Sequence, residues 1–409
     1  MIKKDVVIIG AGPAGLFTGI NIDGRKIDTV ILEKNSSAGK KLLISGGGQC
    51  NITHSGNICD FLDKYGDKKR YLRNSLYGFT NEDLLEFFRK RGLEMEIEES
   101  GKIFPKTRKS EDILNILLKE LKKNNVEIKY KSKVIDVEYE NNIEKFIVKT
   151  DDKTYETKYL VVTTGGKSYQ NTGSTGEGFT IAEKLGHKTV KAKPALTPIY
   201  IKDYSFKNLS GISVKVGLSL WRDNKKINES TGDMLFTHIN LSGPAILDFS
   251  RYVNPKDIIK INFLLDKNKE VFKKEIIKIL QNYGSKYIKT FILDLNIPNR
   301  LGEEIIEISG IKKDKICAEI RKEQREKLVE NLTEMNLAVD KLGDYHLAMV
   351  TAGGVDLIQI NRKTMESKFI KNLYFAGEVL DVDGDTGGYN IQWAFSSGYA
   401  AGKSINVSA

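Results

Sequence analysis

The sequence predicts an α/β fold in which one domain is interrupted by the insertion of another. The first observation is a glycine-rich turn, GAGPAG, between an apolar run and a helical run near the N-terminus. The second is a return of glycine-rich sequence near the C-terminus, after a stretch of different character. We therefore expect residues 1–193 and 343–409 to form one domain, and residues 194–342 to form an inserted β-barrel-like and helical domain.

The N-terminal segment has the pattern of a βαβ unit. An apolar strand over Val6–Ile9 leads into the glycine turn, a helix of small residues follows, and TVILEK is typical of a second strand. Within the turn, Gly10 permits a tight bend, Gly12 lets a pyrophosphate approach the backbone, and Gly15 permits close packing of helix and strand. The pattern predicts a Rossmann-like domain.

An acidic residue at the end of the second strand favours a dinucleotide ligand. Glu33 lies eighteen positions after Gly15, where a carboxylate accepts hydrogen bonds from an adenosine ribose. The helix N-terminus offers N–H groups and a positive dipole end to the phosphates. A glycine turn with a purely structural role is the alternative, and the motif alone leaves both NAD and FAD open.

The rest of the first segment predicts helices and a small meander of strands. Helical patterns cover residues 81–91 and SEDILNILLKELKK, in which Ser110 is expected as the N-cap. KSKVIDVEYE, EKFIVKT and KTYETKYLVV have strand character and are separated by polar turns. We expect this meander to lead back into the sheet.

The inserted segment, residues 194–342, combines strand-like and helical patterns. KVGLSLWRD is strand-like, whereas VFKKEIIKILQNYG and AEIRKEQREKLVENLTEM have helical periodicity with mixed charge. A structural role that completes the fold is one interpretation. The other is that this domain shapes a substrate cavity where two domains meet.

The C-terminal segment returns to glycine-rich sequence. NLYFAGE predicts a buried strand that ends at Gly377 and Glu378, and GYNIQWAFSSGYAAG predicts a helix that begins near Tyr389. This helix carries small residues that permit close packing against another helix or the sheet, namely Ala394, Ser397, Ala400 and Ala401. We expect the N-terminal glycine turn and this segment to meet in one site.

Length and composition favour a cytoplasmic globular protein. The 409 residues are 40% hydrophobic and 29% charged, which is enough for a sizeable core. No window approaches the roughly 18 apolar residues of a membrane helix. Three cysteines, Cys50, Cys59 and Cys317, form no CxxC pair, which argues against a disulfide framework and a zinc site. We expect no membrane partner.

The net charge of +10 does not by itself predict a nucleic-acid partner. Lysines are interspersed with glutamates and aspartates, as in KEVFKKEIIKIL, and form no long basic block. We interpret the charge as a solvated lysine-rich surface rather than a nucleic-acid footprint.

Three consecutive glycines in GKKLLISGGGQCNITH need a reason, since each glycine loses more backbone entropy on folding than any other residue. One interpretation is a flexible surface loop, although such loops are usually more polar than KLLI. The other is a backbone that must stay free of side chains because a ligand approaches it.

Several of these stretches together resemble a known family. GAGPAG with Glu33, the glycine triplet, GKIFP, TTGGKSYQNTGSTGEG, TAGGV and LYFAGEVLDVDGDTGGYNIQWAFSSG are similar to the bacterial FAD-binding flavoproteins that include aminoacetone oxidases and proposed bile-acid-pathway reductases. The resemblance covers nearly the whole chain and is weakest in the inserted domain. Gln49 and Lys102 stand where the family usually has arginine.

The resemblance implies FAD and a set of cofactor-binding residues. It places the flavin along Ser45–Gly48, Lys40 or Lys41 near the pyrophosphate, Thr164 and Gly165 beside the adenosine half, and Val134 beside the adenine. An N-terminus of the last helix aimed at the flavin would favour the anionic reduced ring. The full predicted set is Gly10, Gly12, Ala14, Gly15, Glu33, Lys34, Lys41, Ser45, Gly46, Gly47, Asn51, Val134, Thr164, Gly165, Gly377, Glu378, Asp381, Gly388, Tyr389, Asn390 and Ile391.

No catalytic side chain is identified from the sequence. His54 lies near the triplet and has the titration range of an acid or base, but a core or surface histidine is the simpler interpretation. Cys50 has no partner at redox spacing and is interpreted as an inert thiol. There is no HExxH motif and no GxSxG elbow, so we expect no metal, and the flavin to carry the chemistry.

The leading functional hypothesis is an FAD-dependent oxidoreductase that moves a hydride between flavin N5 and a small organic substrate. We expect reduction of an activated C=C bond, with NAD(P)H as the transient electron donor. An amine or amino-acid oxidase that uses dioxygen is a second hypothesis. An FAD-dependent tRNA-modifying enzyme is a third, consistent with the basic charge. A flavoprotein that stores electrons without turnover is a fourth.

Overall fold

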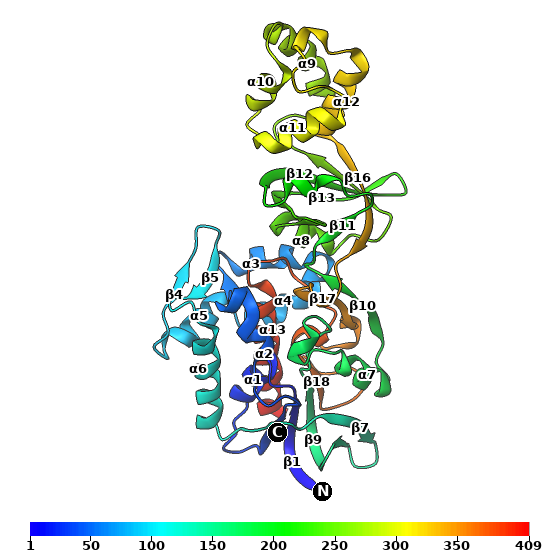
Figure 1. Cartoon of the computed structure of the whole chain (residues 1–409). Helices are drawn as coiled ribbons and strands as arrows, with labels where there is room; N and C mark the ends of the chain where they lie inside the picture. Colours follow the sequence, from blue (N-terminus) through cyan, green and yellow to red (C-terminus); the bar gives the residue numbers. More distant parts are fainter. Residues whose placement is uncertain (409) are drawn as a thin grey trace. The chain divides into compact units, whose positions relative to one another are not determined.

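The computed structural model describes residues 1–408 and divides into two compact units. The first unit comprises Met1–Pro194 together with the chain from Ala348 onward, and the second comprises Ala195–Leu347. Figure 1 shows that both ends of the chain belong to the first unit. The second unit is therefore an insertion in the sequence of the first.

A seven-stranded sheet within residues 1–408 forms the centre of the first unit. Its order is β6-β2-β1-β9-β8-β7, and β18 pairs with β9 as well. These strands are β1 (Ile2–Ile9), β2 (Thr29–Leu32), β6 (Glu127–Lys129), β7 (Val134–Glu140), β8 (Lys145–Thr150), β9 (Thr154–Val162) and β18 (Leu373–Phe375).

Strand β9 joins the parallel sheet to the predicted meander. It runs parallel to β1 and to β18, and antiparallel to β8, which in turn is antiparallel to β7. Strands β2 and β18 are buried along their whole length, as are the last four residues of β1, Val6–Ile9. Continuous apolar runs of this kind are typical of parallel strands covered on both faces.

Helices surround this sheet, and those at Asn81–Arg89, Ser110–Lys123 and Tyr389–Ser408 lie where the sequence patterns predict helices. The helices around the sheet are α1 (Pro13–Ile20), α2 (Lys40–Ile44), α3 (Ile58–Phe61), α4 (Lys69–Gly78), α5 (Asn81–Arg89), α6 (Ser110–Lys123), α7 (Glu177–Lys184) and α13 (Tyr389–Ser408). Smaller sheets are formed by β3 (Thr53–His54), β4 (Met95–Ile97) and β5 (Lys102–Pro105), and by β10 (Thr189–Ala195) and β17 (Val350–Val355).

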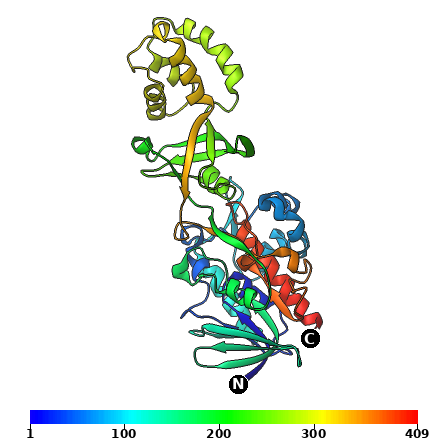
Figure 2. The ribbon, with the colours of Figure 1, turned by 90° about the vertical axis from the view of Figure 1, so that its right-hand side faces the viewer.

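Helices α1 and α13 pack against each other, as Figures 1 and 2 show, so the two ends of the chain are adjacent. The closest approach involves glycines rather than the small residues predicted. A Cβ on Gly398 would lie 2.5 Å from the carbonyl oxygen of Ala14, and one on Gly402 would lie 2.6 Å from that of Thr18. The prediction of close packing by this helix is confirmed, but these two glycines set its distance from α1.

The predicted N-cap at Ser110 is wrong. Lys109 occupies the N-cap position of α6 and makes no side-chain cap, while Ser110 is already helical. The Ser110 hydroxyl instead donates a hydrogen bond to the carbonyl oxygen of Leu43, 2.8 Å away. A tertiary contact to the end of α2 has therefore replaced the local one that the sequence suggested.

The second unit contains a closed barrel and a group of helices. The barrel order is β11 (Ile199–Ile201), β14 (Leu241–Ser242), β13 (Lys225–Phe236), β12 (Ser213–Arg222), β15 (Ile258–Asn262) and β16 (Met335–Leu342). Helix α8 (Pro244–Ser250) follows β14, and the chain between β15 and β16 forms α9 (Lys269–Tyr283), α10 (Ile288–Leu293), α11 (Asn299–Ile308) and α12 (Lys322–Thr333). One apolar core runs through the barrel and these helices.

Across residues 1–408, no helix has both the length and the apolar character needed to cross a membrane.

Candidate functional site

The glycine turn leaves open space where a phosphate is expected. A Cβ on Gly12 would meet no protein atom within 4 Å, and Gly12 is the N-cap of α1 without a side-chain cap. By contrast, a Cβ on Gly15 would lie 2.0 Å from the carbonyl oxygen of Gly10. Gly10 itself has φ +104, a conformation that favours glycine. Gly15 and Gly10 are thus required by the fold, whereas no protein contact requires a glycine at position 12.

Glu33 is buried at the end of β2 and binds the glycine turn directly. Its Oε2 accepts a hydrogen bond from the backbone N–H of Ala11 at 2.8 Å. Its Oε1 accepts from the backbone and side-chain amides of Asn35, both at 2.8 Å. The carboxylate is therefore held rigidly beside the first turn of α1.

The residues predicted for the adenosine half lie around Glu33. Lys34 donates to the Thr175 hydroxyl and pairs with Glu177, both at 2.9 Å. Val134 begins β7, two residues after Ser132, whose backbone N–H bonds to the carbonyl oxygen of Glu33. The structure therefore brings Lys34 and the start of β7 to the same end of β2.

Thr164 and Gly165 follow the end of β9, next to the glycine turn. A Cβ on Gly10 would lie 3.3 Å from the Thr164 Cα. The Thr164 hydroxyl is buried and has no hydrogen-bond partner within the protein. This hydroxyl faces Gly178 of α7, where an added Cβ would lie 2.0 Å from its oxygen, so a water or ligand that satisfies it is expected on that side.

The glycine triplet adopts a left-handed backbone. Ser45–Gly48 forms a 3₁₀ turn in which Gly46, Gly47 and Gly48 have φ values of +56, +66 and +90. A Cβ on Gly47 would meet nothing within 4 Å, whereas one on Gly46 would lie 3.0 Å from the backbone nitrogen of Asn51. Backbone conformation therefore explains the glycines, and the space beside Gly47 is open to a ligand.

Lys41 and Glu378, predicted as separate cofactor contacts, form an ion pair. The Lys41 ammonium lies 2.6 Å from Glu378 Oε2 and donates to the Ser168 hydroxyl at 2.7 Å. Glu378 Oε1 accepts from Ser168 and from the backbone N–H of Thr351. Segments from four parts of the chain therefore meet at one carboxylate.

Asp381 is held by Lys68, a residue that the sequence analysis did not nominate. Their charged atoms are 2.5 Å apart, and Asp381 Oδ1 accepts from the backbone N–H of Gly353. Burial raises the pKa of the Asp381 carboxyl, and the hydrogen bond and charge of Lys68 oppose this rise. Burial is the largest single effect on Lys68 and lowers its pKa, but the hydrogen bond to Asp381 together with the charges of Asp381, Asp67 and Asp383 leaves that pKa raised.

The N-terminus of α13 is fixed by backbone contacts and aromatic packing. A Cβ on Gly388 would lie 2.6 Å from the carbonyl oxygen of Thr53. Tyr389 stacks on His54 with ring centroids 5.1 Å apart, and its carbonyl oxygen accepts from the Tyr65 hydroxyl. The side-chain amide of Asn390 binds both the N–H and the carbonyl of Gly384, so it closes the loop before α13.

The first turn of α13, which also contains Ile391, carries no acidic residue. Its positive dipole end is therefore not neutralised within that turn. Gly377, at the end of β18, lies against the first turn of α1, because a Cβ there would be 2.8 Å from the Ala14 Cβ. The two glycine-rich ends of the chain thus converge around the N-terminus of α1.

These residues fit FAD. Gly12 and Gly47 leave open space beside the backbone, and the N-terminus of α1 has no side-chain cap. Glu33 lies beside the glycine turn, where a ribose is expected. An extended dinucleotide requires this combination of bare backbone, donors and a carboxylate.

His54 and Cys50, the histidine and cysteine nearest the triplet, both lie in surroundings typical of residues with a structural role. His54 Nδ1 lies 2.8 Å from the carbonyl oxygen of Ser55, and its Nε2 lies 3.1 Å from that of Ser100. Cys50 is fully buried, and burial raises the pKa of its thiol to about 12. Within residues 1–408 we find no cluster of three or more His, Cys, Asp and Glu side chains able to hold a metal ion.

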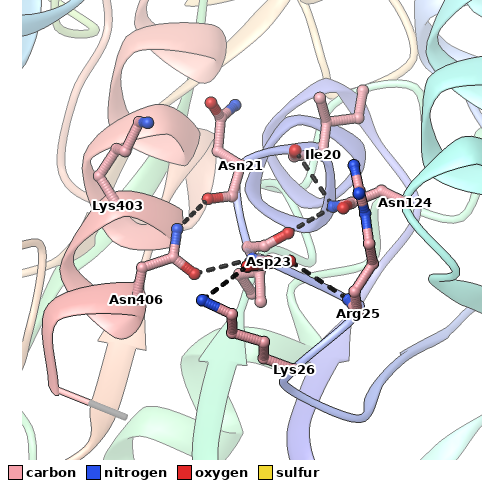
Figure 3. Close-up of a pocket in the computed structure, with 9 residues that line it drawn as sticks. Ile20, Asn21, Asp23, Arg25, Lys26, Asn124, Lys403 and Asn406 are labelled. Carbon is pink, nitrogen blue, oxygen red and sulfur yellow. Dashed lines mark hydrogen bonds and ion pairs between the residues drawn. The ribbon is translucent and has the colours of Figure 1, made fainter.

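A polar pocket of about 450 Å³ lies elsewhere in the first unit, at the C-terminal end of α1 (Figure 3). None of the predicted cofactor residues lines it. The Asn124 side chain donates to the carbonyl oxygens of Gly19 and Ile20, and Asn406 donates to that of Asn21. These amides satisfy the carbonyls at a helix end, so the pocket is explained by helix capping.

Ser168, Thr351 and Lys68 are the members of the site that sequence reasoning missed. Ser168 and Thr351 lie within TTGGKSYQ and TAGGV, two stretches that carried the family resemblance, so a signal for them was present. Lys68 lies in a charged stretch, LDKYGDKKR, and nothing distinguishes it there from its neighbours.

Comparison with known proteins shows the family. Residues 4–404 match the family model described as "HI0933-like protein Rossmann domain". Proteins named "Ribosomal RNA dihydrouridine synthase" are 34% identical in Haemophilus influenzae, over 98% of both chains, and 30% identical in Escherichia coli, over 99% of this chain and 98% of the relative. A "3-dehydro-bile acid delta(4,6)-reductase" of Clostridium scindens is 28% identical over 97% of both chains. The chain belongs to the HI0933-like family of flavin-dependent oxidoreductases, whose Rossmann domain binds FAD.

Proposed function

We propose that this protein is an FAD-dependent reductase that saturates the C5=C6 bond of uridine in ribosomal RNA. The observation that carries the proposal is the similarity, over nearly the whole chain, to proteins named ribosomal RNA dihydrouridine synthase. This similarity favours the hypothesis of an RNA-modifying flavoenzyme over that of a reductase for a free small molecule. The hypothesis from the sequence is a tRNA-modifying enzyme. Because the relatives are named for ribosomal RNA, we propose ribosomal RNA as the substrate instead. This proposal replaces the expectation of no nucleic-acid partner.

The chemistry agrees with the reaction type expected from the sequence. The C5=C6 bond of uracil is conjugated to the C4 carbonyl, so it is an activated double bond. Its reduction adds a hydride at C6 and a proton at C5. We propose that NAD(P)H supplies the hydride overall and is oxidised to NAD(P)⁺, and that the proton comes from solvent or from a side chain of the site. Bound FAD would supply the two-electron redox chemistry between the two substrates.

The site residues have separate roles in this proposal. Gly10, Gly12 and the N-terminus of α1 bind the pyrophosphate, and Glu33 binds the ribose. Ser45–Gly48 and the N-terminus of α13 hold the flavin end, where the helix dipole stabilises negative charge on the reduced ring.

Three predicted residues, Lys41, Glu378 and Asp381, position these contacts. The pair of Lys41 and Glu378 joins α2 to the C-terminal segment. Asp381, paired with Lys68, fixes β17 through Gly353. They are positioning residues, since each acts through the elements that it holds.

Reduction of a small-molecule enone is the second candidate function. It is favoured by the similarity to the bile-acid reductase of Clostridium scindens, whose name specifies another reduction of double bonds. The same flavin chemistry serves both substrates, so the substrate alone separates the two candidates. None of the relatives compared above is named as an amine or amino-acid oxidase.

The test is product formation with each substrate. The FAD-loaded protein is incubated with NADPH or NADH and either an unmodified ribosomal RNA transcript or a steroid 4-en-3-one. We expect dihydrouridine in the nuclease digest of the RNA, detected by mass spectrometry, and no consumption of the steroid. Gly12→Ala, whose added Cβ meets no protein atom, is the matched control with lower FAD occupancy, and its product yield should fall in proportion to its flavin content. Steroid reduction without dihydrouridine would establish the second candidate instead.

A further inference from the structure

Helix α4 presents a face of cationic and aromatic side chains that the cofactor site does not use. Arg70, Arg73 and Tyr77 are exposed on this helix, while Leu72 and Leu76 on the opposite face are buried. The spacing of three and four residues between Arg70, Arg73 and Tyr77 places them on one side of the helix. Helix α4, of sequence KRYLRNSLYG, contains no acidic residue.

The guanidinium groups of this face have no carboxylate partner. Within residues 1–408, no ion pair involves Arg70, Arg73 or the neighbouring Arg362, whereas Lys69 at the start of the helix pairs with Asp63. Arg362 is brought to α4 by its carbonyl oxygen, which accepts from the Ser75 hydroxyl at 3.5 Å. Three unpaired positive charges therefore lie close together.

Aromatic rings hold these arginines in place. The guanidinium carbons of Arg70 and Arg362 lie 4.8 and 4.6 Å from the centroid of the Tyr71 ring, and Arg70 also donates to the Tyr71 hydroxyl at 2.8 Å. The Arg73 guanidinium carbon lies 5.5 Å from the Tyr77 ring, which is 45% exposed. We call Arg70, Tyr71, Arg73, Tyr77 and Arg362 the α4 face.

The α4 face is connected to the proposed flavin end of the site. Helix α4 packs against α13, as Figures 1 and 2 show, and it follows directly after Lys68, the partner of Asp381. Tyr65, one turn earlier, donates to the carbonyl oxygen of Tyr389 at the start of α13. A ligand on the α4 face is therefore bound next to elements that shape the site.

We propose that the α4 face binds the RNA substrate, with the arginines on backbone phosphates and Tyr77 stacked on an unpaired base. Guanidinium groups bind phosphate oxygens in a bidentate manner, and arginine held on an aromatic ring loses little further freedom on binding. Exposed aromatic rings beside such charges stack on bases without regard to sequence. The inference rests on the proposed function, because it supplies the binding surface that an RNA substrate requires.

The experiment measures binding of a single-stranded ribosomal RNA fragment to the FAD-loaded protein as a function of salt. We expect Arg70→Gln/Arg73→Gln/Arg362→Gln to weaken binding by about 100-fold at 0.1 M salt. The slope of the logarithm of the binding constant against the logarithm of the salt concentration should become shallower by about 2, because three phosphate contacts are lost. Tyr77→Ala should weaken binding by about tenfold, whereas Tyr77→Phe should not.

A matched control removes the same charge elsewhere on the first unit. Arg25→Gln/Lys26→Gln/Lys403→Gln changes three exposed basic residues at the pocket of Figure 3 and should leave affinity and slope nearly unchanged. Arg70→Lys/Arg73→Lys/Arg362→Lys should recover most of the slope. Flavin content and the rate of flavin reduction by NAD(P)H should equal those of the parent protein in every variant.

The outcomes separate this inference from the proposed function. Wild-type protein that forms dihydrouridine, with a triple glutamine variant that binds RNA equally well, would overturn the α4 face and leave the function intact. If RNA binding depends on the α4 face but no dihydrouridine forms, the proposed function is wrong and the α4 face remains the RNA-binding surface. The α4 face would also be ruled out as the RNA-binding surface if the Arg25, Lys26 and Lys403 variant lost as much affinity for RNA, or if the parent protein bound no RNA.

Discussion

The ammonium of Lys41 lies 2.6 Å from the carboxylate of Glu378, across 337 positions of sequence. This ion pair joins the segment before the glycine triplet to the C-terminal GEVLD segment, and both side chains are about one quarter exposed or less. Ser168 and the Thr351 backbone complete the hydrogen bonds of Glu378. The two ends of the domain are therefore connected at the proposed cofactor site by charge as well as by packing.

This pair should make a measurable contribution to stability. A double-mutant cycle of Lys41→Gln and Glu378→Gln is expected to give a coupling energy of about 1–2 kcal/mol, because the pair is partly shielded from solvent and its hydrogen bonds are charge-assisted. Urea unfolding of the four proteins measures it. A coupling energy of zero would mean that the two ends are held by packing alone.

Substitution by alanine should affect FAD affinity at Gly12 and stability at Gly15. Gly12→Ala should fold normally, since its Cβ meets no protein atom, but should lower FAD affinity by about 10- to 100-fold through lost phosphate contacts. Gly15→Ala should lose at least about 2 kcal/mol of stability, because its Cβ would lie 2.0 Å from the Gly10 carbonyl oxygen. Flavin titration and thermal unfolding measure the two effects. Normal FAD affinity in Gly12→Ala would contradict the phosphate site.

Removal of Lys68 should produce a pH-dependent loss of stability. In Lys68→Met the buried Asp381 loses the hydrogen bond and charge that oppose the rise of its pKa, so that pKa increases further. The folded variant then holds a proton that the unfolded chain releases, and its stability falls as pH rises through the interval above the ordinary aspartate value of 3.8. We expect a cost of about 2–3 kcal/mol at neutral pH and a much smaller one near pH 4.

The matched variants for this pair are Lys68→Arg, which keeps the positive charge, and Lys68→Met/Asp381→Asn, which removes both charges. Urea unfolding from pH 4 to 8 should show nearly wild-type behaviour for the first and no steep pH dependence for the second. A pH-independent cost in Lys68→Met would show that packing of the lysine stem, rather than its charge, is what matters. Above pH 10.5 the wild-type contribution of Lys68 is lost as its own raised pKa is passed.

The cysteines should differ sharply in reactivity. Cys59 is exposed, whereas Cys50 and Cys317 are buried, and burial raises the pKa of the Cys50 thiol to about 12. Iodoacetamide at pH 8 should therefore modify Cys59 in the folded protein, and all three cysteines only after denaturation. Peptide mass spectrometry locates the adducts. Labelling of Cys50 as fast as Cys59 in the folded protein would contradict its assignment as an inert thiol.

Local sequence patterns were sufficient to predict the first unit's main elements. The turn GAGPAG between β1 and α1 follows from the steric needs of Gly10 and Gly15, and α13 begins at Tyr389 as expected. Strand and helix patterns also predicted a β-rich and helical insertion, and the second unit contains a closed barrel with helices between β15 and β16. These features depend on a few neighbouring residues, which is why sequence reasoning reaches them.

Tertiary partners were not predictable in the same way. The pair of Lys68 and Asp381 spans 313 positions, and a lysine in a charged stretch has many possible partners. Ser110 has the residue type of an N-cap but donates to Leu43 instead, because α2 lies against the start of α6. Gly398 and Gly402 face α1, yet only the position of that helix reveals which small residues of α13 approach it most closely.

The most direct test of the central claim is electron transfer to RNA without any nicotinamide present. The FAD-loaded protein is reduced under anaerobic conditions, freed of reductant, and mixed with an unmodified ribosomal RNA fragment while flavin absorbance is followed. The proposed function predicts recovery of the oxidised flavin spectrum together with an equal amount of dihydrouridine, and no recovery with an RNA whose uridines are already reduced. A flavin that stays reduced in the presence of bound RNA would contradict it.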